Sequence, residues 1–190
     1  PVRAIRAFYH FIMMDLYGDV PILARTPESG EVIERKPRAE VARWIEEELK
    51  AVTPLLTEEN NAETYGRPNK WMAKALLAKL YLNWGVYTCD DVTKVTNETS
   101  NNHEKLNDLV AVCDEIIESG IFEVGKGYRQ KFFPNNGVQI KDFIYAMDFD
   151  PIAMPTKYVG GHQLDRFTTF KKANNCDVGP WGFTPSKSVA

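Results

Sequence analysis

The sequence has few cysteines, few histidines and little net charge. Its 190 residues include three Cys and three His, and 23 Lys and Arg against 26 Asp and Glu give a formal net charge of −3. Cys89, Cys113 and Cys176 are odd in number and lack Cys-x-x-Cys spacing, which argues against a disulfide framework and a metal cluster. A disulfide between Cys89 and Cys176, both of which are expected in loops, is left as an open alternative. Without a basic excess or stripe, the chain has no electrostatic reason to bind nucleic acid or an anionic membrane surface.

Long apolar runs and the common catalytic motifs are also missing. No stretch approaches the length of a membrane-spanning helix, and no signal-peptide pattern follows Pro1. There is no Gly-x-Ser-x-Gly motif, the histidines have no zinc spacing, and the glycines at 125–127 do not have phosphate-loop spacing. Asp148 and Asp150 are the best carboxylate candidates, because a strand would point both to one face, at a separation suited to a glycosidase. Acidic pairs at strand ends are common turn residues, however, so we expect no enzymatic activity.

Four helical patterns occupy most of the first 120 residues. Apolar residues recur in them at three- and four-residue steps, as on the buried face of a helix. The patterns cover residues 2–17, 38–52, 68–87 and 103–119. The third is apolar on more than one side and contains small alanines, so we expect it to pack between neighbouring helices.

The same spacing predicts which residues the helices bury. In the first helix, Ile5, Phe8, Ile12 and Leu16 fall on one stripe, and Gly18 is the expected C-terminal cap. The inward residues expected for the second and fourth helices are Val41, Trp44, Ile45 and Leu49, and Leu106, Leu109, Val110, Cys113, Ile116 and Ile117.

The helical pattern also predicts which polar residues face solvent and which are partly buried. Glu46, Glu47 and Lys50 of the second helix fall largely on its solvent side. His10 of the first helix is expected to be a partly buried structural residue rather than a ligand. The polar stretch 88–102 between the third and fourth helices is expected to be a surface loop.

The helices suggest two antiparallel pairs with tetratricopeptide-like packing. Their spacing varies too much for an exact repeat of about 34 residues, so the repeat is degenerate. After Gly120 the helical periodicity disappears, turn residues dominate, and a short strand is expected at 140–149. We therefore expect a mainly α fold with long irregular loops and little strand, divided into a helical region at 1–120 and a loop-rich region at 121–190.

Five short motifs occur along the chain in the order typical of one protein family. They are LYGDVP at 16–21, RAEVARWIEEEL at 38–49, YGRPNKWMAKALLAKLYL at 65–82, IIESGIFEV at 116–124 and KDFIYAMDF at 141–149. Through them the chain resembles the SusD/RagB family, the surface glycan-binding lipoproteins of Bacteroidetes-type bacteria. In the last motif Asp142 stands where the family usually has Glu.

The resemblance implies a function and a location. It implies a protein that binds oligosaccharide or polysaccharide nutrients at the cell surface without chemistry and delivers them to a SusC-like, TonB-dependent outer-membrane transporter. It implies a place on the extracellular face of the outer membrane, through a lipid on an N-terminal Cys that this sequence does not contain. Because family members are considerably longer, the chain is expected to be an internal fragment. The resemblance also implies that the tetratricopeptide-like helical pairs form a scaffold and that the scaffold side of the protein faces the transporter.

The residues best suited to hold a sugar lie in the loop-rich region. Sugar recognition uses flat aromatic faces flanked by planar polar groups. The candidate ligand-binding residues are Trp181, Tyr158, His162, Asp165 and Arg166. Trp181 lies between Gly-Pro and Gly, where neighbours cover little of an indole. The alternative is that the aromatic residues anchor the loop to the core and that Asp165 and Arg166 form an ordinary surface ion pair.

No cofactor is expected, and a different class of function stays open. Asp90, Asp91 and Asn97 could offer oxygen atoms to calcium, but their spacing is not that of an EF-hand, and a solvated loop is the simpler interpretation. The main alternative function is a helical, tetratricopeptide-like protein–protein interaction scaffold. A concave apolar or charged groove on the helices, without an aromatic platform, would favour it. A glycan-active hydrolase accessory domain is a weaker alternative.

Overall fold

The computed structural model describes residues 1–125, 127–132 and 137–146, and the extended regular elements among these residues are helices joined by loops. The α-helices are α1 (Val2–Tyr17), α2 (Arg38–Val52), α3 (Lys70–Leu82), α4 (Trp84–Thr88), α5 (Asn97–Asn101) and α6 (Leu106–Glu118). Short 3-10 helices are η1 (Thr53–Leu55), η2 (Val92–Lys94) and η3 (Tyr128–Phe132). None of the described helices combines the length and the apolar character needed to cross a membrane.

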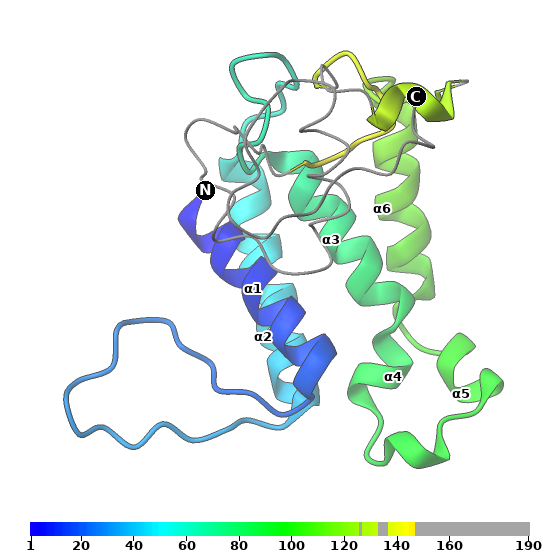
Figure 1. Cartoon of the computed structure of the whole chain (residues 1–190). Helices are drawn as coiled ribbons and strands as arrows, with labels where there is room; N and C mark the ends of the chain where they lie inside the picture. Colours follow the sequence, from blue (N-terminus) through cyan, green and yellow to red (C-terminus); the bar gives the residue numbers. More distant parts are fainter. Residues whose placement is uncertain (126, 133–136, 147–190) are drawn as a thin grey trace, which may run out of the picture.

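The long helices form two antiparallel pairs. Figure 1 shows α1 beside α2 and α3 beside α6, with the chain direction reversing from each helix to the next of these four. Helix α2 also contacts α3 and α4, so α3 is packed on more than one side, as its sequence predicts. The mainly α fold with tetratricopeptide-like pairs is confirmed.

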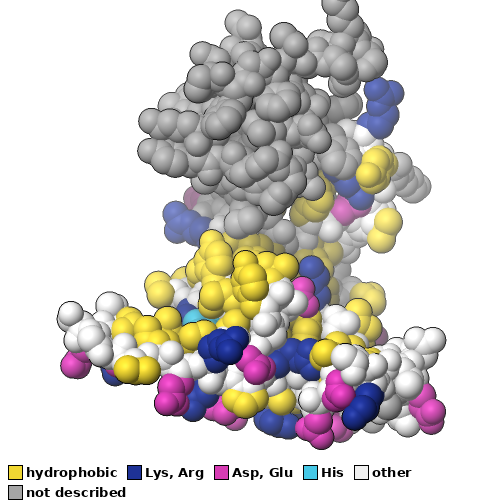
Figure 2. Space-filling model, turned by 60° about the horizontal axis from the view of Figure 1, so that its bottom comes forward, with side chains coloured by type: hydrophobic (Ala, Val, Ile, Leu, Met, Phe, Trp, Pro, Cys, Tyr) yellow, Lys and Arg dark blue, Asp and Glu magenta, His cyan; other side chains and the backbone are white. Residues whose placement is uncertain are grey.

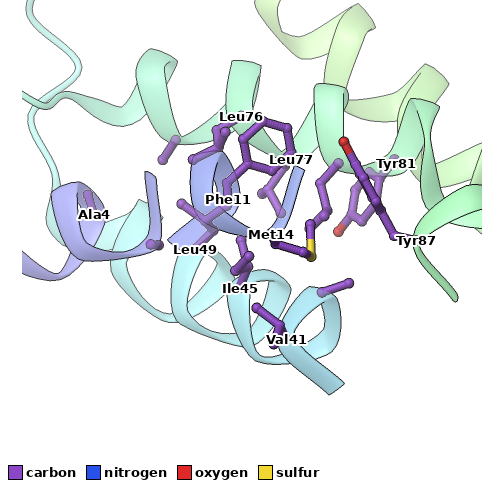
Figure 3. Packing of buried hydrophobic residues seen from close by; sticks show 14 of the residues in the cluster. Ala4, Phe11, Met14, Val41, Ile45, Leu49, Leu76, Leu77, Tyr81 and Tyr87 are labelled. Atoms are coloured by element: carbon purple, nitrogen blue, oxygen red, sulfur yellow. The ribbon is translucent and has the colours of Figure 1, made fainter. Parts of the chain in front are cut away.

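A cluster of buried apolar side chains joins the two pairs (Figure 3). Val41, Ile45 and Leu49 of α2 are fully buried, which confirms most of the face predicted for this helix. Leu76 and Leu80 of α3 are buried in the same cluster. Helix α2 thus contacts both α1 and α3, which also contact each other, and its apolar side chains help to join them.

The buried side of α1 differs from the predicted stripe. It consists of Ala4, Ala7, Phe11 and Met14, whereas Leu16 is 66% exposed. The buried side thus combines two small alanines with the larger Phe11 and Met14. Of the predicted stripe, Phe8 and Ile12 are partly buried against the core, and Ile5 is half-buried. In Figure 2 the molecule is turned so that the end at the bottom of Figure 1 comes forward. Hydrophobic side chains gather in one area of the surface seen there.

The face predicted for α6 is only partly correct. Ile116 is buried and Leu109 packs against the core, but Val110 and Ile117 are 58% and 72% exposed. Cys113 is half-buried rather than buried. The reason is the position of α6 at the edge of the bundle, where α3 covers one side of it.

The third predicted helix is interrupted. Instead of one helix over 68–87, α3 ends at Leu82 and α4 begins at Trp84. The Asn83 side chain donates to the carbonyl of Lys79 at 3.3 Å, and both Asn83 and Gly85 have poor helix propensity. The stretch 88–102, expected to be a loop, contains η2 and α5, and α6 begins three residues later than predicted.

The predicted strand is absent over the residues of it that are described. Residues 140–146 contain a turn at 141–142 and otherwise irregular backbone, and the Ile140 N–H closes the preceding turn by donating to the carbonyl of Gly137 at 2.9 Å. Residues 147–149 lie outside the described part. Asp142, the departure from the family motif, pairs with Lys131, and the backbone of Gly125 also donates to its carboxylate. Both interactions lower the pKa of Asp142. Through them Asp142 connects the turn at 141–142 to Lys131 of η3 and to the backbone at Gly125.

The Gly-Asp-Val-Pro segment that follows α1 holds together the two ends of the long connection between α1 and α2. Gly18 has a φ of 75°, as its predicted capping role requires. The Asp19 carboxylate accepts from the backbone N–H of Arg38 at 2.8 Å, at the first turn of α2, and Val20 pairs with Lys36 in an isolated antiparallel bridge. This motif therefore fixes the place where the chain enters α2.

His10 is a structural residue, as predicted. It is 4% exposed, and its Nδ1 lies 2.8 Å from the carbonyl of Arg6. Its Nε2 accepts from the backbone N–H of Leu23 at 3.1 Å. One imidazole thus ties the start of the α1–α2 connection to α1.

Candidate functional site

The sugar-binding residues predicted from the sequence lie outside the described residues. This applies to Trp181, Tyr158, His162, Asp165 and Arg166, and also to Asp148, Asp150 and Cys176. Their roles, and the pairing of Cys89 with Cys176, stay predictions. The candidate site that the described part contains is a groove on the helices.

The groove lies between the end of α2 with η1, the outer side of α3, and α6. Its cavity volume is about 460 Å³, within the range of small-ligand sites. We call it the α2–α3–α6 groove and define it by its lining residues. They are Lys50, Thr53, Pro54, Lys70, Lys74, Leu77, Tyr81, Asp108, Ala111, Val112 and Glu115.

Lys74 is a buried cation in this groove. The residue is 7% exposed, and its ammonium pairs with the carboxylate of Glu115 on α6, whose side chain is 56% exposed. Burial lowers the pKa of Lys74, the charge of Lys70 lowers it further, and Glu58 partly offsets both effects. The groove thus contains a weakly solvated positive charge that favours an anionic partner.

A second buried charge, Glu46, lies next to the groove, and its position corrects the expectation that it faces solvent. Glu46 is 7% exposed. Its Oε1 accepts from the Tyr81 hydroxyl at 3.0 Å and contacts the ammonium groups of Lys50 at 2.6 Å and Lys105 at 2.7 Å. Glu47 and Lys50 are exposed, as predicted. A buried carboxylate needs such partners, and only the folded chain brings them together.

Lys105 connects the start of α6 to α2 and α3. Its ammonium lies 5.5 Å from the centroid of the Tyr81 ring and 5.2 Å from that of Trp84, within cation–π range. Burial lowers the pKa of Lys105, but the interactions with Glu46 and Asp108 outweigh it, so the pKa is raised overall. The indole of Trp84 donates to Glu104 at 3.0 Å. Two consecutive residues before α6 thus position that wall of the groove.

Acidification is expected to weaken the fold through Glu46. Burial alone would raise the pKa of Glu46, but the hydrogen bonds from Lys105, Lys50 and Tyr81 lower it below its ordinary value of 4.5. The ionised carboxylate therefore contributes stability above pH 4.5, and this contribution is lost as the pH falls from 4.5 through the lowered pKa. Urea unfolding from neutral pH down to about pH 3 measures the effect.

The matched control is a Glu46→Gln variant, which cannot titrate at this position. The difference in the free energy of unfolding between the parent and this variant should shrink as the pH falls below 4.5. A difference that stays constant over that range would show that the ionisation of Glu46 does not contribute to stability.

Sequence reasoning missed Glu46, Lys74 and Lys105. A usable signal existed for Lys74, which shares a stripe of α3 with Lys70, Leu77 and Tyr81 at four- and three-residue steps. A lysine on such a stripe indicates a buried charge or a groove. No local signal existed for the pairing of Glu46 with Lys105, since 59 positions separate them.

The calcium suggestion stays a prediction. Within the described residues, no group of three or more His, Cys, Asp or Glu side chains could hold a metal ion. The Asp91 carboxylate accepts from the N–H and the hydroxyl of Thr93 at 3.0 and 2.6 Å and pairs with Lys94. These contacts are those of a helix cap at the start of η2.

The helical core matches a known family in sequence. Residues 4–82 match the SusD-like family model described as "Starch-binding associating with outer membrane". The chain is 32% identical over 87 residues to the starch-binding protein SusD of Bacteroides thetaiotaomicron. That match covers 46% of this chain and 15% of the relative, so the matched part spans a small share of the relative's length.

Two solved structures share the fold. A SusD-like protein from Bacteroides fragilis NCTC 9343 gives a TM-score of 0.60 at 24% identity, covering 78% of this chain and 26% of that chain. A SusD superfamily protein from the same organism gives 0.58 at 22% identity, covering 78% and 29%. At these identities the likeness establishes the fold.

Proposed function

We propose that this chain, whose residues 4–82 match the SusD-like family model, is part of a glycan-capturing protein of the outer membrane. The intact protein would bind oligosaccharides or polysaccharides without altering them and deliver them to a SusC-like, TonB-dependent transporter. The observation that carries the proposal is the match of α1, α2 and α3, which form the core, to a starch-binding family.

The proposal includes a location and a division of labour. The protein would be attached by an N-terminal lipid to the extracellular face of the outer membrane, in line with the outer-membrane association in the family's description. The helical region 1–120 would be the scaffold, and the loop-rich region 121–190 would contribute ligand contacts. Glycan and transporter are the proposed partners, and nucleic acid is not one.

The expected result for the glycan site is saturable binding that depends on Trp181. Removing one stacking ring by Trp181→Ala should weaken the binding about tenfold. Starch oligosaccharides, fructans, mannans and N-glycan fragments are titrated into the full-length protein that carries this chain and into the variant, with heat and tryptophan fluorescence as readouts. Product analysis of the same mixtures should show no cleavage.

The matched control is Tyr17→Ala, which removes an aromatic ring that is 75% exposed on α1. It should leave glycan affinity unchanged. Binding that survives Trp181→Ala would remove this residue from the site, and no binding to any glycan would contradict the proposal.

A second function is favoured by a specific observation. The α2–α3–α6 groove is concave and charged, and the one aromatic residue among its lining side chains, Tyr81, is 1% exposed. Such a groove without an aromatic platform is the feature expected of a helical protein–protein interaction scaffold.

A further inference from the structure

The charges of the α2–α3–α6 groove are arranged by wall. Lys50, Lys70 and Lys74 come from α2 and α3, whereas Asp108 and Glu115 come from α6. The partners of Lys70 and Lys74 are Glu58 and Glu115, whose side chains are 65% and 56% exposed. Lys70 and Lys74 are thus neutralised by carboxylates that reach in from solvent, whereas Lys50 pairs with the buried carboxylate of Glu46.

The pair of Lys74 and Glu115 is unequal in its burial. The Lys74 side chain is 8% exposed, so its ammonium cannot recover much hydration if it loses its partner. The Glu115 side chain is largely in water and can be hydrated fully on leaving. An incoming carboxylate could therefore replace Glu115 with little loss, because the buried charge stays paired throughout.

We propose that the α2–α3–α6 groove binds an extended acidic segment of a partner protein, and that a carboxylate of this segment displaces Glu115 from Lys74. This goes beyond glycan capture, and it gives the scaffold function proposed above a class of partner. Glu115 then acts as an internal competitor that occupies the cation when no partner is bound.

The rest of the lining fits a peptide better than a sugar. The Tyr81 ring is covered, with the ammonium groups of Lys50 and Lys105 at 6.0 and 5.5 Å from its centroid, so it offers no open face to a sugar ring. Ala111 and Val112 of α6, which are exposed and half-buried, provide apolar surface in the lining. An extended peptide that alternates acidic and apolar side chains presents both kinds of group with a two-residue period.

The test is calorimetric titration of the full chain with an acetylated and amidated pentapeptide that alternates Glu and Leu. Glu115→Gln should bind it about tenfold more tightly, because the competitor loses its charge, and Lys74→Met about tenfold more weakly. Displacement predicts these opposite effects at Glu115 and Lys74 and no effect of the same charge changes elsewhere on the two helices. Glu115→Gln also keeps the test decisive if Lys74→Met fails to fold.

Matched controls are available on the same two helices. Lys79→Met on α3 and Asp114→Asn on α6 change exposed residues that do not line the groove, and both should leave the affinity unchanged. The same peptide with Gln in place of Glu should not bind measurably.

Several outcomes would overturn the proposal. No binding of the acidic peptide to the parent chain would do so, as would an affinity that Glu115→Gln leaves unchanged or weakens. Binding of trigalacturonate in the groove without binding of the peptide would assign the site to acidic glycans instead. None of these outcomes depends on Trp181, so failure here is distinguishable from failure of the glycan proposal.

Discussion

Replacing Glu46 with alanine is expected to lower the free energy of unfolding by about 3 kcal/mol. Its carboxylate contacts Lys105, Lys50 and the Tyr81 hydroxyl at 2.7, 2.6 and 3.0 Å. Without Glu46, the Lys105 side chain, which is 17% exposed, loses this partner, and the buried Tyr81 hydroxyl loses its acceptor. Buried polar groups without partners carry their full desolvation cost. Urea unfolding followed by far-UV circular dichroism measures the change.

The neighbouring position supplies the control. Glu47 is exposed on the same helix, so Glu47→Ala should change the free energy of unfolding by less than about 0.5 kcal/mol. The two variants share the same chemical change and the same gain in helix propensity. Equal effects would therefore contradict the orientation of α2 that places Glu46 against α3.

Local pattern predicted the second helix to the residue because the sequence itself marks its ends. Pro37 precedes α2, and Pro54 follows Thr53 in η1, so the helix can extend neither way. The first helix was equally well bounded, since Gly18 ends it with a positive φ. Helix boundaries of this kind depend on short-range sterics, which a sequence displays directly.

The buried face of α1 could not be predicted in the same way. The predicted stripe contains Ile5, Phe8 and Leu16, but the buried side of α1 contains Ala4, Ala7, Phe11 and Met14 instead. Which side packs depends on how closely two backbones can approach, and that depends on the partner helix. The same limitation explains Val110 and Ile117 of α6, whose exposure reflects which side α3 covers.

The burial of Glu46 beside the α2–α3–α6 groove could not be predicted from the local sequence pattern, for a different reason. Glu46 belongs to a run of acidic residues on α2, and such a run ordinarily faces water. Its burial depends on Lys105 and Tyr81, which other helices bring to it. The loop residues proposed for glycan binding, Trp181 foremost, rest on composition and family resemblance, because they lie outside the described structure.

Replacing Leu80 with alanine is expected to lower the free energy of unfolding by about 3 kcal/mol. Leu80 of α3 is fully buried in the core cluster that joins the helix pairs. Its truncation removes buried methyl groups and leaves a cavity that surrounding helices fill only in part. Thermal or urea unfolding of the parent and the variant under the same conditions gives the difference.

Leu82→Ala is the matched control, because Leu82 lies two residues further along the same helix and is 58% exposed. It makes the same chemical change with the same gain in helix propensity, so the effect should stay within about 0.5 kcal/mol. The contrast between the two variants measures burial alone. It also tests the groove, since the rotation of α3 that buries Leu80 is the one that places Lys74 and Tyr81 in the lining. Similar losses from both variants would contradict that rotation and, with it, the position of the basic wall.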